Sequence, residues 1–508
     1  MELLQINPRI EPGLRWAAVR QVVNGLTGTL GVLAYTRMLR PEDLGAFGLA
    51  LVVYQGLLSL IEAPMRDAVV YFRDEQGQHD SAAFWILLAF SSLAVILVWT
   101  LSPGLIRLYR FEVDASLVWV MGLAFFGRAM GLVPGALLLK RFQFAWYEGL
   151  LMLADMILFV GWVTLAWRGL GAWSLVLPVL FSTVCLSAAA WWASGFRPQR
   201  WPAASAFRDV LRFTRNLFGS KLASYLCGYI DNAAAGLMGA RALGLYSLGE
   251  DQSAFAVISV GVPLANIALP VLANARARME EFKRIYLNML RLTATLTLPM
   301  QIGVFLLADL GIKVLFGEQW LEAAPVLRAY LVFRLVDALL TQCSAATSAA
   351  GRPDIQFKLD VAQAPFFLLV AWAALSRGVG IIGLAWMLAC MRSLAGLVYL
   401  AVTLRLAGAN LAEAGRSLGP SLLSGVLMGA AVFGLRGSGM VQGWVRGVQP
   451  ALLADGLELT LLVASGAVTY LLILWIVDRA GLKDVLRLAW RVLVPSKAPR
   501  LPITGKIS

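Results

Sequence analysis

Long hydrophobic runs dominate the chain, and short polar stretches separate them. Segments such as 82–102, 116–139, 359–376 and 452–477 are long enough, as helices, to cross a hydrocarbon layer of roughly 30 Å. About 14 such runs occur, and they begin near residues 15, 44, 82, 116, 147, 170, 216, 250, 287, 322, 359, 380, 419 and 452. The pattern predicts an all-α polytopic membrane protein.

Composition agrees with this pattern. The 508 residues are 59% hydrophobic and 14% charged, with a mean hydropathy of +0.74. A soluble globular protein has about 25% charged residues. A large soluble protein with buried helices would not need apolar runs of this length, so that interpretation is rejected.

The placement of Lys and Arg predicts an orientation. Most basic residues outside the runs fall in alternate loops, on the side that holds both ends of the chain. This bias predicts cytoplasmic N- and C-termini, and the polar start shows no pattern of a cleavable signal peptide. The net charge of +13 then reflects topology and contact with anionic lipid headgroups. A nucleic-acid partner is not expected.

Residues suited to metal or redox chemistry are scarce. Cys185, Cys227, Cys343 and Cys390 fall within predicted spans at no metal-ligand spacing, so packing is the simpler role for them. The only histidine, His79, lies in a polar loop. We therefore expect no metal and no cofactor.

Several short motifs occur twice, in the same order. Leu44–Leu49 (LGAFGL) returns as Leu243–Leu248 (LGLYSL), and Arg168–Gly171 (RGLG) returns as Arg377–Gly380 (RGVG). These collinear matches, at similar offsets of 199 and 209 residues, predict a duplicated half. In a chain this apolar, duplicated halves are typical of transporters that rock around a central site.

The duplication predicts two six-helix lobes related by a pseudo-twofold axis, followed by two C-terminal helices. The expected divisions are an N-lobe at 1–194, an amphipathic cytoplasmic linker at 195–215, a C-lobe at 216–406, the final two spans at 407–477, and an amphipathic cytoplasmic tail at 478–508.

Other motifs resemble a known family. Leu315–Trp320 (LFGEQW), followed by Ala323–Leu327 (AAPVL), resembles the signature after the ninth span of Wzx-type polysaccharide transporters. These are lipid-linked oligosaccharide flippases of the multidrug/oligosaccharidyl-lipid/polysaccharide (MOP) flippase superfamily. Pro41–Gly45 (PEDLG) and Ala350–Asp354 (AGRPD) also agree, and the resemblance covers about residues 14–405. One departure is Glu62-Ala63, where members often carry an acidic residue followed by glycine.

The resemblance implies paired helical bundles that alternate between inward-open and outward-open states. It also implies a substrate built from an undecaprenyl carrier, a pyrophosphate and a short sugar chain. This substrate would cross the bacterial inner membrane for exopolysaccharide, O-antigen or capsule synthesis. Polysaccharide polymerase or export machinery is then an expected partner.

Two alternatives stay open. One is a multidrug or other lipid-precursor exporter of the same superfamily. The other, less favoured, is a membrane glycosyltransferase or polysaccharide polymerase, which would need acidic catalytic residues in a large external loop. The loop 103–115 offers only Glu112 and Asp114, more simply read as solubilising charges. We therefore do not expect an enzyme.

Cations inside the predicted spans are the candidate substrate ligands, because a charge buried in a span usually faces a cavity or a partner. The duplication pairs Arg20 with Lys221, and Arg128 with Arg334. This predicts a ring of four cations around the axis. The ring suits a pyrophosphate, because Arg presents paired donors to phosphate oxygens and Lys supplies a compact charge.

Polar side chains share faces with these cations. Asn24 follows Arg20 by one helical turn, and Tyr225 and Asn232 lie along one stripe with Lys221. We expect these side chains to bind sugar hydroxyls. Arg20 also lies near the end of its span, so reaching out to lipid headgroups is an alternative for it.

Four carboxylates within the spans are candidates for ion coupling: Asp155, Asp231, Asp337 and Asp360. A buried carboxylate with a raised pKa takes up a proton near neutral pH. Counter-ion duty to nearby cations is the alternative, and Arg334 and Asp337 are spaced to pair on one helix.

Overall fold

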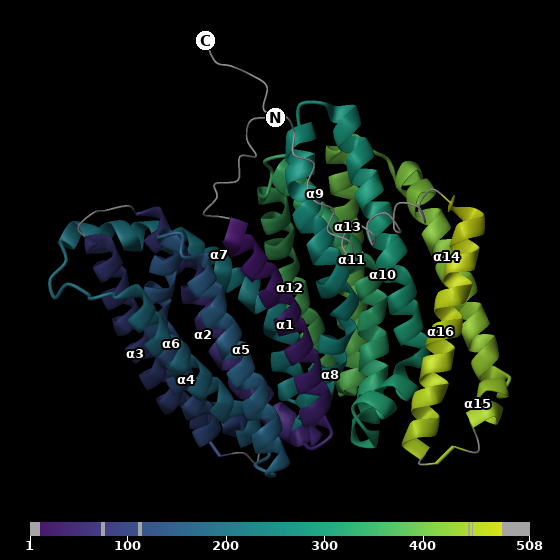
Figure 1. Cartoon of the computed structure of the whole chain (residues 1–508), viewed down its shortest axis with the longest axis horizontal. Coiled ribbons are helices and arrows are strands. Elements are labelled where there is room, and N and C mark those ends of the chain that lie inside the picture. The colour runs from purple at the N-terminus through teal and green to yellow at the C-terminus, as the bar shows by residue number, and fades with distance from the viewer. Residues whose placement is uncertain (1–10, 73–76, 110–113, 446–447, 450, 480–508) are drawn as a thin grey trace. The chain divides into compact units, whose positions relative to one another are not determined.

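The computed structural model describes residues 11–72, 77–109, 114–445, 448–449 and 451–479 (Figure 1). Within these ranges its regular secondary structure is helical. The helices are α1 (Glu11–Thr36), α2 (Pro41–Tyr71), α3 (Gln78–Tyr109), α4 (Ser116–Lys140), α5 (Phe144–Trp167), α6 (Trp173–Ser194), α7 (Ala204–Gly236), α8 (Ala240–Ser253), α9 (Val262–Ala275), α10 (Met279–Leu315), α11 (Ala324–Ala349), α12 (Asp354–Arg377), α13 (Gly380–Leu406), α14 (Leu411–Gly437), α15 (Met440–Val445) and α16 (Ala451–Val477). A π-helical turn covers Val257–Gly261, and a 3-10 turn covers Glu318–Ala323.

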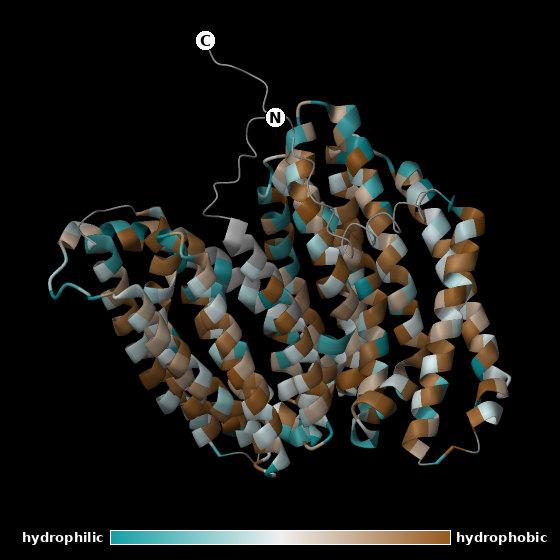
Figure 2. Ribbon diagram, in the orientation of Figure 1, coloured by the Kyte–Doolittle hydropathy of each residue, from teal (hydrophilic) through white to brown (hydrophobic). Residues whose placement is uncertain are grey.

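Each predicted span coincides with helix, and the all-α membrane fold is confirmed. In the described part of the chain, 11 helices are long and apolar enough to cross a membrane, with the run Ala240–Ala275 counted as one. Hydrophobic residues extend along the helices, and hydrophilic residues gather at helix ends and loops (Figure 2). Three predicted spans, α1, α7 and α11, fall outside the 11. These are the helices that carry Arg20, Lys221 and Arg334, so the candidate site residues themselves lower the hydropathy of their spans.

The chain divides into two compact units. Unit 1 comprises residues 1–252, 311–330 and 354–392, and unit 2 comprises 253–310, 331–353 and 393–508. The division into two six-helix lobes that the duplication predicts stays a prediction.

Unit 1 is built around α4, which packs against α2, α3 and α6, while α5 contacts α1 and α6 (Figure 1). Phe125 and Met121 of α4 and Leu87 of α3 are fully buried in this bundle. Lys140 at the end of α4 lies 2.9 Å from Asp80 at the start of α3, which fixes these two helix ends together.

The connection into α7 differs from the expected separate linker helix. After α6 ends at Ser194, the chain lies against α3, where the Gln199 backbone amide donates to the Ser81 hydroxyl (3.1 Å) and the Trp85 indole donates to the Gln199 backbone carbonyl (2.8 Å). The segment 204–215 then continues without a break into the span that follows, because α7 is one helix of 33 residues. The predicted amphipathic tail lies almost wholly outside the described residues.

The repeated Arg-Gly-x-Gly motifs adopt the same local conformation. Gly169 and Gly171 have φ of +76° and +56°, and Gly378 and Gly380 have φ of +62° and +69°. These are left-handed values that glycine adopts without steric cost. The motif thus encodes one turn twice, between α5 and α6 and between α12 and α13.

The repeated Leu-Gly motifs meet one another where α2 crosses α8. A methyl group at Gly45 would lie 1.8 Å from the Ala240 carbonyl oxygen, and one at Gly244 would lie 1.9 Å from the Pro41 carbonyl oxygen. Gly45 and Gly244 hold matching places in the motif, as do Pro41 and Ala240. Reciprocal contacts of this kind are those that a twofold relation produces.

In unit 2, the last helices are fastened to α10. The Lys283 ammonium lies 2.6 Å from the Glu413 carboxylate of α14, and the Tyr470 hydroxyl of α16 donates to the Thr295 carbonyl at 2.8 Å. Asn410 and Glu413 form a capping box that starts α14, with hydrogen bonds of 2.8 and 3.0 Å. The final helices of the chain therefore have specific polar contacts with a span that precedes them.

Candidate functional site

A cavity of about 510 Å³ lies inside unit 1. Side chains from α1, α2, α4, α5, α6, α7 and α8 form its wall. Its aromatic residues are Tyr35, Phe47, Tyr54, Trp162 and Tyr229; its polar residues are Gln55, Ser182, Thr183, Asn232 and Ser247; its charged residues are Arg20, Arg128, Asp155 and Asp251. Four of the predicted site residues, Arg20, Arg128, Asn232 and Asp155, are therefore brought to one cavity.

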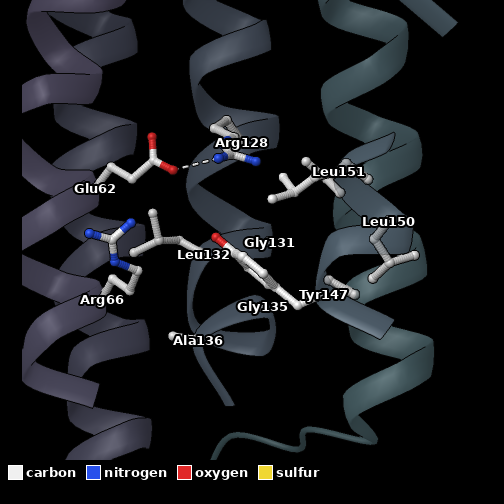
Figure 3. Close-up of a pocket in the computed structure, with 12 residues that line it drawn as sticks. Glu62, Arg66, Arg128, Gly131, Leu132, Gly135, Ala136, Tyr147, Leu150 and Leu151 are labelled. Atoms are coloured by element: carbon white, nitrogen blue, oxygen red, sulfur yellow. Dashed lines mark hydrogen bonds and ion pairs between the residues drawn. The ribbon is translucent and has the colours of Figure 1, made fainter. Parts of the chain in front are cut away.

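Arg128 is held by a carboxylate from another helix. Its guanidinium lies 2.5 Å from Glu62 of α2, with about a fifth to a quarter of each side chain exposed. Figure 3 shows Arg128 reaching toward Glu62, with Arg66 farther along α2 and the Tyr147 ring between the helices. The pair is electrically balanced, so Arg128 does not stand in the wall as a bare cation.

Arg20 sits beside two carboxylates of α5 without a hydrogen bond to either. The guanidinium is 3.5 Å from Glu148 and 3.4 Å from Asp155. Among the described residues, the buried atoms Nε of Arg20, Oε2 of Glu148 and Oδ2 of Asp155 have no hydrogen-bond partner. A buried donor without an acceptor is costly. An anionic oxygen in the cavity would satisfy it.

Of the three predicted ligands on α7, only Asn232 is part of the cavity wall. Asn232 lines the cavity and accepts a hydrogen bond from the Ser247 hydroxyl at 2.9 Å. Tyr225 donates to the Val52 carbonyl of α2 and stacks on Tyr229, with ring centroids 4.6 Å apart. Its hydroxyl is thus already used in packing α7 on α2. Lys221 is exposed on α7 and is not part of the cavity wall.

The other predicted ligands lie elsewhere. Asn24 is exposed on α1, and Asp360 lies on α12; neither lines the cavity. Arg334 belongs to unit 2, where its guanidinium lies 2.7 Å from Asp337 on the same helix and donates to Ser253 at 3.1 Å. The helix-local pairing weighed for Arg334 is therefore present. The ring of four cations stays a prediction.

Asp231 is completely buried in an ionic cluster. Its carboxylate lies 2.9 Å from the Arg392 guanidinium of α13 and accepts a hydrogen bond from the Tyr330 hydroxyl at 2.7 Å. Glu250 of α8 lies 3.6 Å from Arg392 and accepts from the Asn232 amide at 2.9 Å. Through Asn232 the cluster adjoins the cavity, and Asp231 serves as counter-ion to Arg392.

The loop that was expected to face outward, at 103–115, has one of its two acidic residues, Asp114, in the described part of the chain. Asp114 accepts a hydrogen bond from the Ser116 amide at 3.2 Å, at the start of α4. This is the contact of a carboxylate that caps a helix. Glu112 lies outside the described residues. Among those that are described, no group of His, Cys, Asp and Glu is arranged to hold a metal ion.

The sequence analysis named Asp155 but missed two other acidic neighbours of the arginines, Glu148 and Glu62, and the aromatic wall. Glu148 lies seven positions before Asp155, which places both on one face of α5 two turns apart, and that spacing was a usable signal. Glu62 lies 66 positions from Arg128, so no local pattern could reveal the pair. The aromatic residues look like ordinary core positions in the sequence.

The chain belongs to the polysaccharide biosynthesis protein family, whose model matches residues 32–325. It is 25% identical over 420 residues to the teichuronic acid biosynthesis protein TuaB of Bacillus subtilis (strain 168), covering 80% of this chain and 83% of that protein. It is 27% identical over 328 residues to the succinoglycan biosynthesis transport protein ExoT of Rhizobium meliloti (strain 1021), covering 63% and 65%. The resemblance recognised in the sequence motifs is confirmed.

Solved structures share the fold. The lipid II flippase MurJ in an inward closed conformation aligns with a TM-score of 0.72 at 13% identity, covering 92% of this chain and 99% of that one. An inward-facing multidrug resistance MATE family transporter of the MOP superfamily aligns with a TM-score of 0.61 at 15% identity, covering 77% and 98%. At these identities the likeness concerns the fold alone.

Proposed function

We propose that this member of the polysaccharide biosynthesis protein family is a flippase for a lipid-linked oligosaccharide. It moves an undecaprenyl-pyrophosphate-linked sugar chain from the cytoplasmic to the outer leaflet of the bacterial inner membrane by alternating access. Both termini are cytoplasmic, and the product enters exopolysaccharide, O-antigen or capsule synthesis. Polysaccharide polymerase or export machinery receives the flipped substrate.

The observation that carries this proposal is the buried Arg20 Nε, which lacks an acceptor at the wall of the unit 1 cavity. A pyrophosphate supplies anionic oxygens that accept from guanidinium groups. A bound pyrophosphate would take the place of Glu148 and Asp155 as the anion nearest to Arg20. The Arg20 guanidinium would then exchange two ion pairs without hydrogen bonds for charge-assisted hydrogen bonds.

The remaining wall suits the sugar part of such a substrate. Tyr35, Trp162 and Tyr229 offer flat apolar surfaces, and Gln55, Ser182 and Thr183 offer hydrogen-bonding groups. A site with few polar groups among aromatic side chains is typical of small-molecule recognition. The polyprenyl tail stays in the lipid while the headgroup passes.

Ion coupling belongs to the same proposal. Asp155 lines the cavity beside Arg20, so headgroup binding to Arg20 frees a carboxylate that then takes up a cation or proton. Three other carboxylates are weaker candidates for ion coupling: Asp231, Asp337 and Asp360. Asp231 and Asp337 are already paired with arginines.

No covalent step is required, so we propose that the protein is not an enzyme. A multidrug exporter of the same fold is the alternative. The charges of the wall do not decide against its usual cargo, an organic cation, because Arg20 and Arg128 both lie beside carboxylates, so a transport assay must decide.

Reconstitution separates these functions. Purified protein in liposomes is offered a polyprenyl-pyrophosphate-linked oligosaccharide, the same carrier without sugar, or a fluorescent organic cation. We expect translocation of the first cargo only. Export of the cation alone, or elongation of the glycan, would replace this proposal with one of its alternatives.

A matched pair of variants tests the predicted ring within the same assay. Arg128→Ala combined with Lys221→Ala is expected to abolish translocation of the oligosaccharide. Lys358→Ala removes a cation that is exposed at the start of α12 and should leave the rate unchanged.

A further inference from the structure

Two polar side chains of the cavity wall hold their hydrogen-bonding groups in fixed directions. Asn232, near the end of α7, and Ser247 of α8 both line the cavity, and both are partly buried. The Ser247 hydroxyl donates to the Asn232 side-chain oxygen at 2.9 Å. The Asn232 side-chain nitrogen donates to the Glu250 carboxylate, also at 2.9 Å. Together these two bonds determine what the pair can offer to a ligand.

Glu250 determines which way the Asn232 amide faces. A carboxylate only accepts hydrogen bonds, so the amide turns its NH2 group toward Glu250 and its oxygen toward Ser247. The reverse orientation would place two oxygens together with no proton between them. Glu250 lies 3.6 Å from the guanidinium of Arg392, whose side chain is only 11% exposed, and this ion pair keeps the carboxylate in place.

The Asn232 oxygen in turn determines which way the Ser247 hydroxyl faces. A hydroxyl has one proton, and Ser247 donates it to Asn232, so the lone pairs of the serine oxygen can only accept. The Asn232 amide has two N–H groups, and within the described part of the chain only one of them has an acceptor. The wall therefore offers an N–H donor and an oxygen acceptor side by side.

A secondary amide on the ligand matches this pair. Its carbonyl oxygen accepts and its N–H donates, and neither group can take the other role. Two sugar hydroxyls could also reach the pair, but each hydroxyl donates or accepts equally well, so fixed directions in the wall give hydroxyls no advantage. Among sugars, the N-acetylated amino sugars carry a secondary amide, which ends in a methyl group.

Apolar side chains next to Ser247 suit that methyl group. A methyl group at Gly48 of α2 would lie 3.8 Å from the Ser247 hydroxyl oxygen, so this glycine borders the serine. Leu44 and Phe47 of the same helix also line the cavity. An acetyl methyl group that contacts them is removed from water, which favours binding.

The pair lies far from the Arg128 end of the cavity. Gly48 precedes Glu62 on α2 by 14 positions, which is about 21 Å along the helix axis. Glu62 is the carboxylate that holds Arg128. A ligand group at Asn232 and Ser247 is therefore part of the sugar chain and not the pyrophosphate.

From these contacts we infer that Asn232 and Ser247 form a subsite for the acetamido group of an N-acetylated amino sugar. Asn232 donates to the acetyl oxygen, and the acetamido N–H donates to Ser247. This inference rests on the proposed function for the presence of a sugar chain in the cavity, and it names the class of sugar that the cavity selects.

Binding in detergent tests the subsite without transport. The purified full chain is titrated with two short-chain prenyl pyrophosphates in a calorimeter. One carries chitobiose, whose two sugars are N-acetylglucosamine, and the other carries cellobiose, in which two glucose units have the same linkage. Because a site built to bind an N–H rejects the analogue that lacks it, we expect chitobiose to bind at least tenfold more tightly. Equal affinities, a preference for cellobiose, or no binding of either ligand would overturn the subsite.

A matched pair of serine variants assigns the preference to Ser247. Ser247→Ala removes the acceptor of the subsite. Ser182→Ala removes another hydroxyl of the same wall, one that donates to the Val179 carbonyl of its own helix at 3.0 Å. We expect Ser247→Ala to bring the two affinities within threefold of each other and Ser182→Ala to keep the parent ratio. The parent ratio in Ser247→Ala, or its loss in Ser182→Ala, would overturn the subsite.

Liposomes that contain the same disaccharides on full-length carriers test the proposed function separately. Selective binding of chitobiose in detergent without flipping of either carrier would keep the subsite and overturn the proposed function. Flipping of both carriers at one rate, with equal affinities in detergent, would keep the proposed function and overturn the subsite.

Discussion

Duplicated residues have matching surroundings at the α2–α8 crossing, whereas the duplicated cations do not. At the crossing, the two copies of the motif make reciprocal contacts: Gly45 meets Ala240 while Gly244 meets Pro41. The cations that the duplication pairs have unlike surroundings, and of Arg128 and Arg334 only Arg128 lines the cavity. Arg128 has a partner on another helix, Glu62, whereas Arg334 has one on its own helix.

The difference follows from what each region must satisfy. A close backbone contact tolerates only glycine, so both copies of the motif are held to the same residue. Under the proposed function, the cavity wall binds a cargo that lacks twofold symmetry, so side chains at matching positions in the two copies need not be alike.

Breaking the buried cluster next to the wall should have the largest effect on stability. Asp231→Ala leaves the Arg392 guanidinium, only 11% exposed, without its nearest carboxylate. Removing one partner of a buried pair costs about 3–5 kcal/mol. We expect a large fall in the thermal unfolding temperature in detergent.

Adding Arg392→Leu to Asp231→Ala should recover part of that loss, because no buried guanidinium then remains. No recovery in the double variant would mean that the cluster stabilises the protein by some means other than this pair.

The two Arg-Gly-x-Gly turns should lose similar amounts of stability when their first glycine is replaced. Gly169→Ala and Gly378→Ala each force a side chain into a left-handed conformation, at about 1–2 kcal/mol. The two variants should therefore lose similar amounts of thermal stability when measured side by side. A loss confined to one of them would show that the duplicated turns do not carry the same strain.

Much of the fold, but only half of the site, was predictable from sequence. Apolar run length fixes helices, and both Gly-x-Gly turns were visible as repeats. Arg20, Arg128 and Asn232, which the sequence singles out because polar side chains avoid lipid, line one cavity, and their role as substrate ligands stays a prediction. Two ion pairs were not predictable: Glu62 reaches Arg128, and Arg392 reaches Asp231, by packing between helices far apart in the chain.

A buried hydrogen bond also fastens the end of α1 near the crossing, where the Trp320 indole donates to the Thr36 carbonyl at 2.9 Å. Trp320→Phe keeps an aromatic side chain but leaves the Thr36 carbonyl without the indole donor. A lost neutral hydrogen bond costs about 1 kcal/mol. We expect a small drop in the unfolding temperature in detergent. An unchanged unfolding temperature would show that this hydrogen bond does not stabilise the protein.

Exchanging the exposed charges at the crossing should have the smallest effect. Glu42→Arg alone, or Arg241→Glu alone, places like charges together and should cost less than about 1 kcal/mol. The two changes together restore the pair of opposite charges that Arg241 and Glu42 make at 3.0 Å, but leave a carboxylate at position 241 beside Glu322. The double variant should therefore recover part of the loss in unfolding temperature, and no recovery would mean that the two sites are not interchangeable.

The central claim is that an anionic headgroup completes the hydrogen bonds of Arg20. The most direct measurement is the initial rate at which liposomes containing Arg20→Gln flip a polyprenyl-pyrophosphate-linked oligosaccharide, normalised to folded protein. Arg20→Lys, which keeps the charge, serves as the matched control. We predict at least a tenfold loss for Arg20→Gln and a smaller loss for Arg20→Lys. Flipping by Arg20→Gln at the parent rate would contradict the account.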